Sequence, residues 1–144
     1  MQNEYYNNNL DIALSDDGDL VFHITEDNQY EISLVKGSEQ VIQGVEVRLK
    51  TNLMELFLHE NFGNRLLDII GKRNTRETAD LGRRFLMDTI LRENRIIDPA
   101  HLKISATPLD ASKLMYIIKI ADSPFSSVDI MLEVDLEHGI RRVV

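Results

Sequence analysis

The sequence has no cysteine and no tryptophan among its 144 residues. Without cysteine the chain can form no disulfide, no thiolate nucleophile and no cysteine metal site, and it requires no oxidising compartment. No apolar run approaches the roughly 20 residues of a membrane-spanning helix. The first ten residues, MQNEYYNNNL, lack the basic start and apolar core of a signal peptide. We therefore expect a soluble chain that is made in the cytoplasm and has no membrane partner.

Basic residues are absent from the first 35 positions, which hold eight acids. Residues 65–95 show the opposite balance, with eight bases and five acids. This unevenness fits either a solubilising surface with chance clustering or a dipolar molecule whose poles meet different neighbours in an assembly. Nucleic acid is not an expected partner, because the only basic segment also carries acids.

The patterns typical of enzyme active sites are also missing. The four histidines are scattered without a metal-ligand spacing such as HExxH, and no GxSxG or Walker-type glycine loop occurs. Carboxylate pairs such as Glu55 with Glu60 or Asp68 can be named, but with 24 acids in the chain a pair is no evidence of a site. The turn SDDGD lacks the closing glutamate of a calcium loop. We expect no catalytic residue, no bound metal and no cofactor.

Hydrophobic periodicity changes twice along the chain. Apolar residues alternate over 10–14 and 20–24 around the turn SDDGD, which predicts a β-hairpin. Helical spacing follows, first in VIQGVEVRL and then over 76–94, where Thr75 is placed to cap the longer helix. The last third of the chain alternates strictly in three segments, which predicts strands with one buried face.

We expect residues 10–144 to form a single α+β domain, preceded by a loose segment over residues 1–9. Its antiparallel sheet would combine the N-terminal hairpin with the C-terminal strands, and its helices would pack on one face. The predicted buried face of the last two strands consists of Leu114, Tyr116, Ile118, Ile120, Val128, Ile130, Leu132 and Val134. The residues predicted on the opposite face are Lys113, Lys119, Asp129, Glu133 and Asp135.

The end of the long helix carries a candidate binding element. Leu86 and Ile90 define an apolar stripe, and Glu93 continues this stripe at the helix end. A carboxylate on that side needs a cation or several donors, because leaving it buried and unpaired costs several kcal/mol. The candidate cations are Arg48, Arg83 and Arg95. Either Glu93 emerges into solvent at a frayed helix end, or a paired Glu–Arg element fixes the turn or reaches a partner.

The tail EHGIRRVV follows a predicted turn and has the apolar character of a strand that pairs with a neighbour. Long regular strands in a small domain suit β-augmentation, in which an open sheet edge recruits a strand of another chain through main-chain hydrogen bonds. The candidate partner-binding residues of the tail are Ile140, Arg141, Arg142, Val143 and Val144.

Three segments, DIALSDDGDLVF, LVKGSEQVIQGVEVRLKT and ENFGNRLLDIIG, follow one another in an order that resembles a known family. The chain is similar, over about residues 10–136, to the contractile-tail sheath initiators, small baseplate wedge proteins of contractile phages, phage-tail-like bacteriocins and related injection systems. The family's Glu-Pro-Arg signature is matched by Glu93-Asn94-Arg95, with Asn94 in the place of the proline.

The resemblance implies a structural assembly protein that joins the baseplate wedge to the tube region and initiates sheath polymerisation by strand exchange. The implied partners are baseplate wedge proteins, the sheath protein and inner tube or tube-initiator proteins. The implied location is the host or producer cytoplasm during assembly, and then the assembled tail. The implied partner-binding residues are Glu93, Asn94 and Arg95, with Arg48 as a candidate beside them. The family's lysozyme-like label leaves a cell-wall-degrading enzyme as the alternative, and an adaptor of the same fold with other partners is a third reading.

Overall fold

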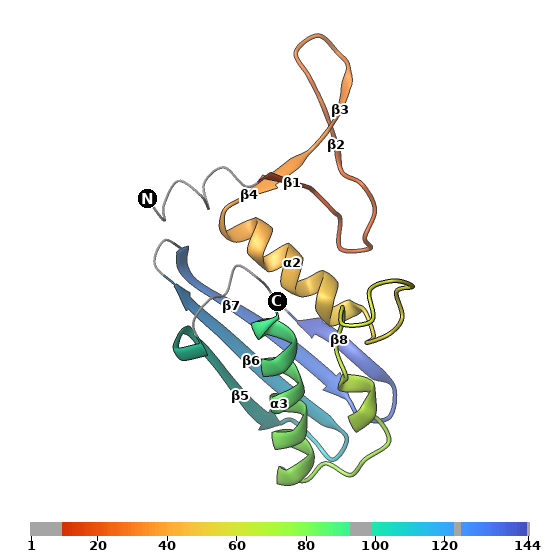
Figure 1. Ribbon diagram of the computed structural model, residues 1–144, viewed down its shortest axis with the longest axis vertical. Helices are drawn as coiled ribbons and strands as arrows, with labels where there is room; N and C mark the ends of the chain where they lie inside the picture. The colour runs from red at the N-terminus through yellow and green to blue at the C-terminus, as the bar shows by residue number, and fades with distance from the viewer. Residues whose placement is uncertain (1–9, 93–98, 123–124, 144) are drawn as a thin grey trace. The chain divides into compact units, whose positions relative to one another are not determined.

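The computed structural model describes residues 10–92, 99–122 and 125–143, with the backbone alone at 122, 125–127 and 141–143. The chain packs as two compact units, 1–43 and 44–144, here called the N-terminal and C-terminal units and described separately. Helices and antiparallel sheets occur in the order expected for an α+β protein, so the predicted fold class is confirmed (Figure 1). The predicted single sheet is wrong, because among the described residues the N-terminal strands pair only with one another and the last four strands form a separate sheet. The predicted single domain over 10–144 stays a prediction, and the segment 1–9 lies outside the described residues.

Two short ladders form the N-terminal unit. Strand β1 (Leu10–Ile12) pairs with β4 (Leu34–Lys36), and β2 (Phe22–Ile24) pairs with β3 (Tyr30–Ile32). The turn SDDGD is present and is closed by a bridge between Leu14 and Leu20. The predicted hairpin between 10–14 and 20–24 is thus present only next to its turn, where the Ser15 N–H donates to the Asp19 carbonyl at 2.9 Å and the Val21 N–H donates to the Ala13 carbonyl at 3.2 Å.

The reason for this difference lies in a second turn at residues 25–29, which returns the chain so that later strands pair with β1 and β2. The ladders meet where the Ala13 N–H donates to the Ser33 carbonyl at 2.8 Å and the Ser33 N–H donates to the Val21 carbonyl at 2.8 Å. The Gln43 side chain ties β1 to the first half of α2 (Ser38–Lys50), because its amide nitrogen donates to the Ile12 carbonyl at 2.8 Å.

A four-stranded antiparallel sheet forms the C-terminal unit. Its order is β5 (Leu102–Pro108), β6 (Lys113–Asp122), β7 (Phe125–Asp135) and β8 (Gly139–Val143). Helix α3 (Arg76–Leu91) and the 3-10 helix η1 (Leu66–Ile69) lie over one face of this sheet (Figure 1). A second 3-10 helix, η2 (Pro99–His101), precedes β5.

The core follows the predicted alternation along β6 and β7. All eight residues predicted on the inward face of these strands are buried. On the opposite face Lys119 lies 3.8 Å from Asp129, its cross-strand partner. Asp135 shares the predicted face with Lys113, its cross-strand partner, although it is buried there. Its carboxylate accepts the N–H groups of Glu137 at 2.9 Å and of His138 at 3.3 Å, which draws it into the turn before β8.

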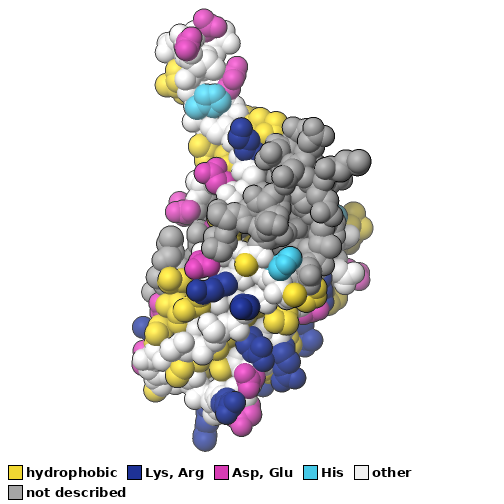
Figure 2. Space-filling view, turned by 90° about the vertical axis from the view of Figure 1, so that its left-hand side faces the viewer, with side chains coloured by type: hydrophobic (Ala, Val, Ile, Leu, Met, Phe, Trp, Pro, Cys, Tyr) yellow, Lys and Arg dark blue, Asp and Glu magenta, His cyan; other side chains and the backbone are white. Residues whose placement is uncertain are grey.

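Helix α3 begins as the sequence predicts. The Thr75 hydroxyl accepts the Thr78 N–H at 3.2 Å, which satisfies one of the free donors of the first turn. The helix ends at Leu91, before the predicted Asn94. Figure 2 views the side of the C-terminal unit that carries β5 and α3, where Lys and Arg side chains gather beside hydrophobic ones.

Candidate functional site

A single buried amide organises the loop that connects α2 to η1. The Asn64 side-chain nitrogen donates to the carbonyl oxygens of Leu49 at 2.7 Å, Thr51 at 2.9 Å and Arg48 at 3.1 Å. The Asn64 side-chain oxygen accepts the Leu66 N–H at 2.8 Å. The end of α2, the loop and the start of η1 are therefore held together by one side chain whose polar atoms are all satisfied.

The two ends of the same loop are also joined through the backbone. The Asn64 N–H donates to the Thr51 carbonyl at 2.9 Å, and the Leu53 N–H donates to the Asn64 carbonyl at 2.9 Å. Gly63 has φ +108, and a Cβ there would lie 2.7 Å from the Thr51 carbonyl oxygen. Only glycine fits this close approach, so the loop has a rigid, closed base.

The tip of the loop, residues 54–58, is here called the apolar loop because it exposes large hydrophobic side chains. Phe57 is 89% exposed and Leu58 is 80% exposed, and Met54 is also exposed. Met54 and Leu58 have positive φ values of 67° and 71°. Left-handed backbone at a non-glycine residue costs about 1–3 kcal/mol and persists only where the surrounding structure enforces it. Exposed apolar side chains on an enforced backbone are typical of a partner-binding surface.

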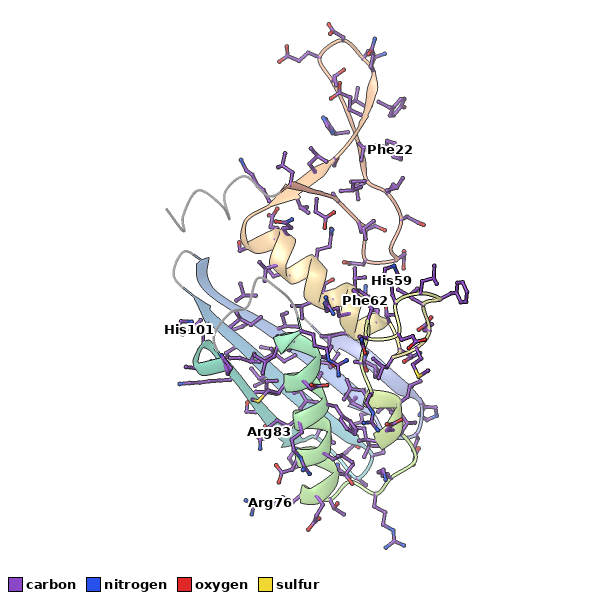
Figure 3. The ribbon with its side chains drawn as sticks, in the orientation of Figure 1. Phe22, His59, Phe62, Arg76, Arg83 and His101 are labelled. Atoms are coloured by element: carbon purple, nitrogen blue, oxygen red, sulfur yellow. The ribbon has the colours of Figure 1, made fainter. Side chains whose placement is uncertain are left out.

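An open hollow of about 640 Å³ lies beside the apolar loop. Its lining residues are Arg48, Leu58, His59, Glu60, Asn61, Phe62, Leu91 and Arg92. The guanidinium carbon of Arg48 lies 4.6 Å from the centroid of the Phe62 ring, a cation–π contact. The Arg92 guanidinium donates to the Asn61 carbonyl at 3.2 Å and to the Asp88 carboxylate at 2.6 Å. Figure 3 shows His59 and Phe62 in the loop that follows α2.

The hollow brings one predicted residue, Arg48, to the end of α3. Glu93, Asn94 and Arg95 themselves lie outside the described residues. The last described residues before them, Leu91 and Arg92, line the hollow with Arg48. The third candidate cation, Arg83, lies 3.8 Å from Asp80. The partner-binding role of the Glu-Asn-Arg element stays a prediction.

The apolar loop and Phe62 were missed by sequence reasoning. The segment LMELFLHENFGN fits no regular period, so the sequence indicates only an extended or irregular stretch there. A signal was present, because four large hydrophobic residues in five positions, MELFL, match neither helical spacing nor strict alternation. Residues of that kind outside a regular element often bind another molecule.

The predicted tail forms β8, which pairs with β7 of its own sheet in the register Val134↔Ile140. Ile140 lines a smaller cavity of about 250 Å³ together with Leu49, Leu67 and Ile130. The backbone of Arg141, Arg142 and Val143 belongs to β8, whereas Val144 lies outside the described residues. Strands β5 and β8 are the outer strands of the sheet, so the partner role of the tail stays a prediction about an outer strand.

In the part of the chain that the structure describes, one group of side chains offers three ligand atoms within 4.8 Å of one another: Asp135, Glu137 and His138. Asp135 already accepts two backbone N–H groups and lies 3.0 Å from the His138 ring nitrogen Nδ1. The N–H of Glu137, and then His138, hold the pKa of the Asp135 carboxyl below its ordinary value. This group closes the turn into β8, and its hydrogen bonds explain its geometry without a metal.

The carboxylates considered as a catalytic pair also have structural partners. Glu55 accepts the Asn52 N–H at 2.7 Å, and Asp68 pairs with Arg65 at 2.8 Å. Both interactions stabilise the backbone or the surface near the loop.

No helix among the described residues is both long and apolar enough to cross a membrane. In comparisons with protein families, curated proteins and solved structures, no family model matches the chain, and no curated protein and no solved structure matches it.

Proposed function

We propose that this protein is a structural subunit of the baseplate of a contractile tail or injection system. In this role it joins the wedge proteins to the tube region and starts polymerisation of the sheath, without enzymatic activity. The order of the three sequence segments and the Glu93-Asn94-Arg95 element support the proposal, and so does a surface built for contact with another protein.

The apolar loop carries the proposal. It presents Phe57 and Leu58 to solvent on a base that Asn64 and Gly63 hold closed. Burying a large apolar side chain contributes about 1.5–3 kcal/mol. A preformed loop loses little conformational entropy on binding, so most of that free energy is available for docking. The loop borders the hollow at the end of α3, where the Glu93-Asn94-Arg95 element follows, and a wedge protein is the expected occupant.

The sheet supplies a second contact. Outer strands leave one row of main-chain N–H and C=O groups unpaired within the described residues, and an incoming strand of the sheath protein pairs with such a row. Charged cross-strand pairs on the exposed face, such as Lys119 with Asp129, disfavour indiscriminate association before assembly.

Reconstitution with wedge proteins from the same gene cluster tests the role of the apolar loop. Phe57→Ser with Leu58→Ser should leave the thermal unfolding midpoint unchanged, because both side chains are exposed, and should prevent entry into the wedge complex. Leu109→Ser is the matched control, since Leu109 is 49% exposed and does not line the hollow. Normal wedge assembly by the double variant would show that the apolar loop does not bind the wedge proteins and would contradict the proposal.

A second assay addresses the enzyme alternative. Purified protein incubated with cell walls should release no fragments and should not clear a turbid suspension. Reproducible release that depends on protein concentration, and that one carboxylate substitution abolishes, would replace the structural role with hydrolysis.

A further inference from the structure

The β2–β3 hairpin of the N-terminal unit has one apolar face. The register pairs Phe22 with Ile32 and Ile24 with Tyr30, so these four side chains point to the same side of the ladder. Each of them is between 43% and 76% exposed. The other face carries His23, whose ring nitrogen Nε2 lies 3.8 Å from the Glu31 carboxylate.

The hairpin has a defined turn but too few contacts to be stable alone. The Thr25 N–H donates to the Gln29 carbonyl at 2.9 Å, and Asn28 adopts φ 60, which asparagine tolerates well. Each N-terminal ladder has only three residues per strand. Backbone hydrogen bonds through Ser33 join the hairpin to the β1–β4 ladder, but two-stranded ladders of this length are marginally stable in water and gain stability when an apolar face is covered. We therefore expect another surface to cover the apolar face of the hairpin.

The sign of the charge indicates what that surface carries. Residues 1–43 hold nine acids and one base, which gives −8, whereas residues 44–144 hold fifteen of each, which gives zero. The whole net charge of the chain, −8, thus belongs to the N-terminal unit. Glu26 and Asp27 are exposed in the hairpin turn, and Figure 2 shows acidic side chains at this tip. A matching surface must combine apolar groups with positive charge.

The C-terminal unit has such a surface, the α3–β5 groove. This groove has a volume of about 450 Å³, and its lining includes the apolar Ile104, Ala106 and Leu114. Its charged lining residues are Arg76, Arg83 and Asp80, so positive charge exceeds negative charge by one. Figure 3 shows the two arginines on the same side of α3. Strand β5 pairs with β6 alone among the described residues, so its outer edge offers free main-chain groups to another strand.

Arg76 is unfavourably placed with respect to the dipole of the helix in which it lies. It occupies the first turn of α3, where the helix dipole favours a negative side chain and disfavours a positive one. Arg83 lies 3.8 Å from Asp80, and both side chains are substantially exposed, so this pair binds weakly. Both guanidinium groups are therefore accessible to carboxylates of an incoming chain.

We propose that the β2–β3 hairpin of one copy docks in the α3–β5 groove of a second copy. Phe22 and Ile24 cover the apolar floor of the groove, Glu26 and Asp27 face Arg76 and Arg83, and a hairpin strand extends the sheet at β5. The contact joins two different surfaces, so it is heterologous and links copies head to tail. Such a series closes into a ring or continues as a filament. This docking requires only the purified chain and is independent of the proposed baseplate role.

Charge reversal on each side tests the docking. The hairpin variant is Glu26→Lys with Asp27→Lys, and the groove variant is Arg76→Glu with Arg83→Glu. At low salt the unchanged protein should associate with increasing concentration, measured as molar mass by light scattering after size exclusion. Each variant alone should remain a monomer, because it places like charges across the contact. An equimolar mixture of the two variants should recover the association, since every hairpin then meets a groove of opposite charge.

Two controls keep the result specific. Asp17→Lys with Asp19→Lys makes the same change in net charge in the other turn of the N-terminal unit, and this variant should still associate. Circular dichroism should show that all variants keep the fold of the unchanged protein. The proposal is overturned if the unchanged protein stays monomeric at every concentration, or if the mixture does not recover the association. If the charge-reversed variants are monomers with a lower unfolding midpoint, the hairpin contacts the groove within a single chain. If the monomer enters tails through its hairpin, the hairpin binds another protein. Either result also overturns the proposal.

Discussion

Gly82 of α3 lies directly against the phenol of Tyr116 on β6. A Cβ at position 82 would overlap the Tyr116 hydroxyl and lie 2.9 Å from Cδ1 of Ile69. The Tyr116 hydroxyl donates to the Ala79 carbonyl at 3.0 Å, one helical turn earlier. The missing side chain of Gly82 is therefore what lets α3 approach the sheet closely enough for this hydrogen bond.

Gly82→Ala should destabilise the protein although alanine favours helices. The substitution gains about 1 kcal/mol of helix propensity, but forcing a methyl group into a packed core typically costs about 1–3 kcal/mol. Ile69 and Tyr116 are both fully buried, so neither can move away freely. We expect a net loss of about 1 kcal/mol in the free energy of unfolding by urea. The loss should shrink in the double variant with Tyr116→Phe, which removes the hydroxyl; equal losses in both backgrounds would show that the two residues are not coupled.

We expect the free energy of unfolding to fall at alkaline pH because of the Tyr116 hydroxyl. Burial, and then the charge of Asp80, raise the pKa of Tyr116 from 10.0 to about 12. The unfolded chain therefore loses this proton at lower pH than the folded chain. The stabilising contribution of Tyr116 is fully present below pH 10 and is lost as pH rises through about 12.

Urea unfolding between these two pH values, measured for the unchanged protein and for Tyr116→Phe, isolates this contribution. Other groups titrate alike in both proteins, so the difference between their unfolding free energies should change with pH only through Tyr116. A difference that stays constant up to pH 12 would contradict the assignment.

The alternation of apolar residues was sufficient to predict β6 and β7. Each strand buries every second residue, so the spacing of Leu114, Tyr116 and Ile118 is enough to predict both the strand and its buried face. The cap of α3 was predictable for a similar reason, because the Thr75 hydroxyl accepts the N–H of Thr78, only three positions later in the sequence. Features that depend on neighbours in sequence are accessible to sequence reasoning.

Features that depend on distant residues were not. Strand β1 pairs with β4 because the chain turns back at residues 25–29. The turn signal at SDDGD predicted pairing with residues 20–24 instead. Helix propensity alone marks Gly82 as unfavourable within α3, and the residue that explains it, Tyr116, lies 34 positions away in the sequence. Asn64 carried no pattern, although it bonds to three carbonyls of the preceding helix and loop. The apolar loop of the candidate site inherits its geometry from that asparagine and was missed with it.

Asn64→Ala should open the loop between α2 and η1. The change leaves the buried carbonyl of Leu49 without its side-chain donor, and an unsatisfied buried polar group costs about 1–3 kcal/mol. The Thr51 carbonyl loses one of two donors and keeps the Asn64 N–H. We expect lower stability and faster proteolysis within residues 54–58, measured by limited digestion and mass spectrometry. Asn61→Ala is the control, since Asn61 is exposed and is used through its backbone carbonyl. Equal cleavage rates in both variants would show that Asn64 does not hold the loop closed.

Removing the last strand separates a structural role from a partner role for the tail. Strand β8 pairs with β7 over the register from Met131↔Val143 to Asp135↔Gly139, so deleting residues 140–144 leaves much of the β7 edge without its partner. Ile140→Ala keeps the strand and removes only a half-buried side chain, which should lower the free energy of unfolding by about 1 kcal/mol. The deletion should cost clearly more, because main-chain hydrogen bonds are lost with it.

The comparison of these two variants in tail assembly is therefore informative only below both unfolding midpoints. There, if β8 is the outer strand at which the proposed sheath contact forms, the deletion should impair sheath growth from the baseplate, while Ile140→Ala should support it. Negative-stain imaging of sheath length and yield provides the measurement. Full-length sheaths on baseplates that contain the folded deletion variant would mean that β8 only completes its own sheet. In that event β5, the other outer strand, becomes the edge at which an incoming strand must pair.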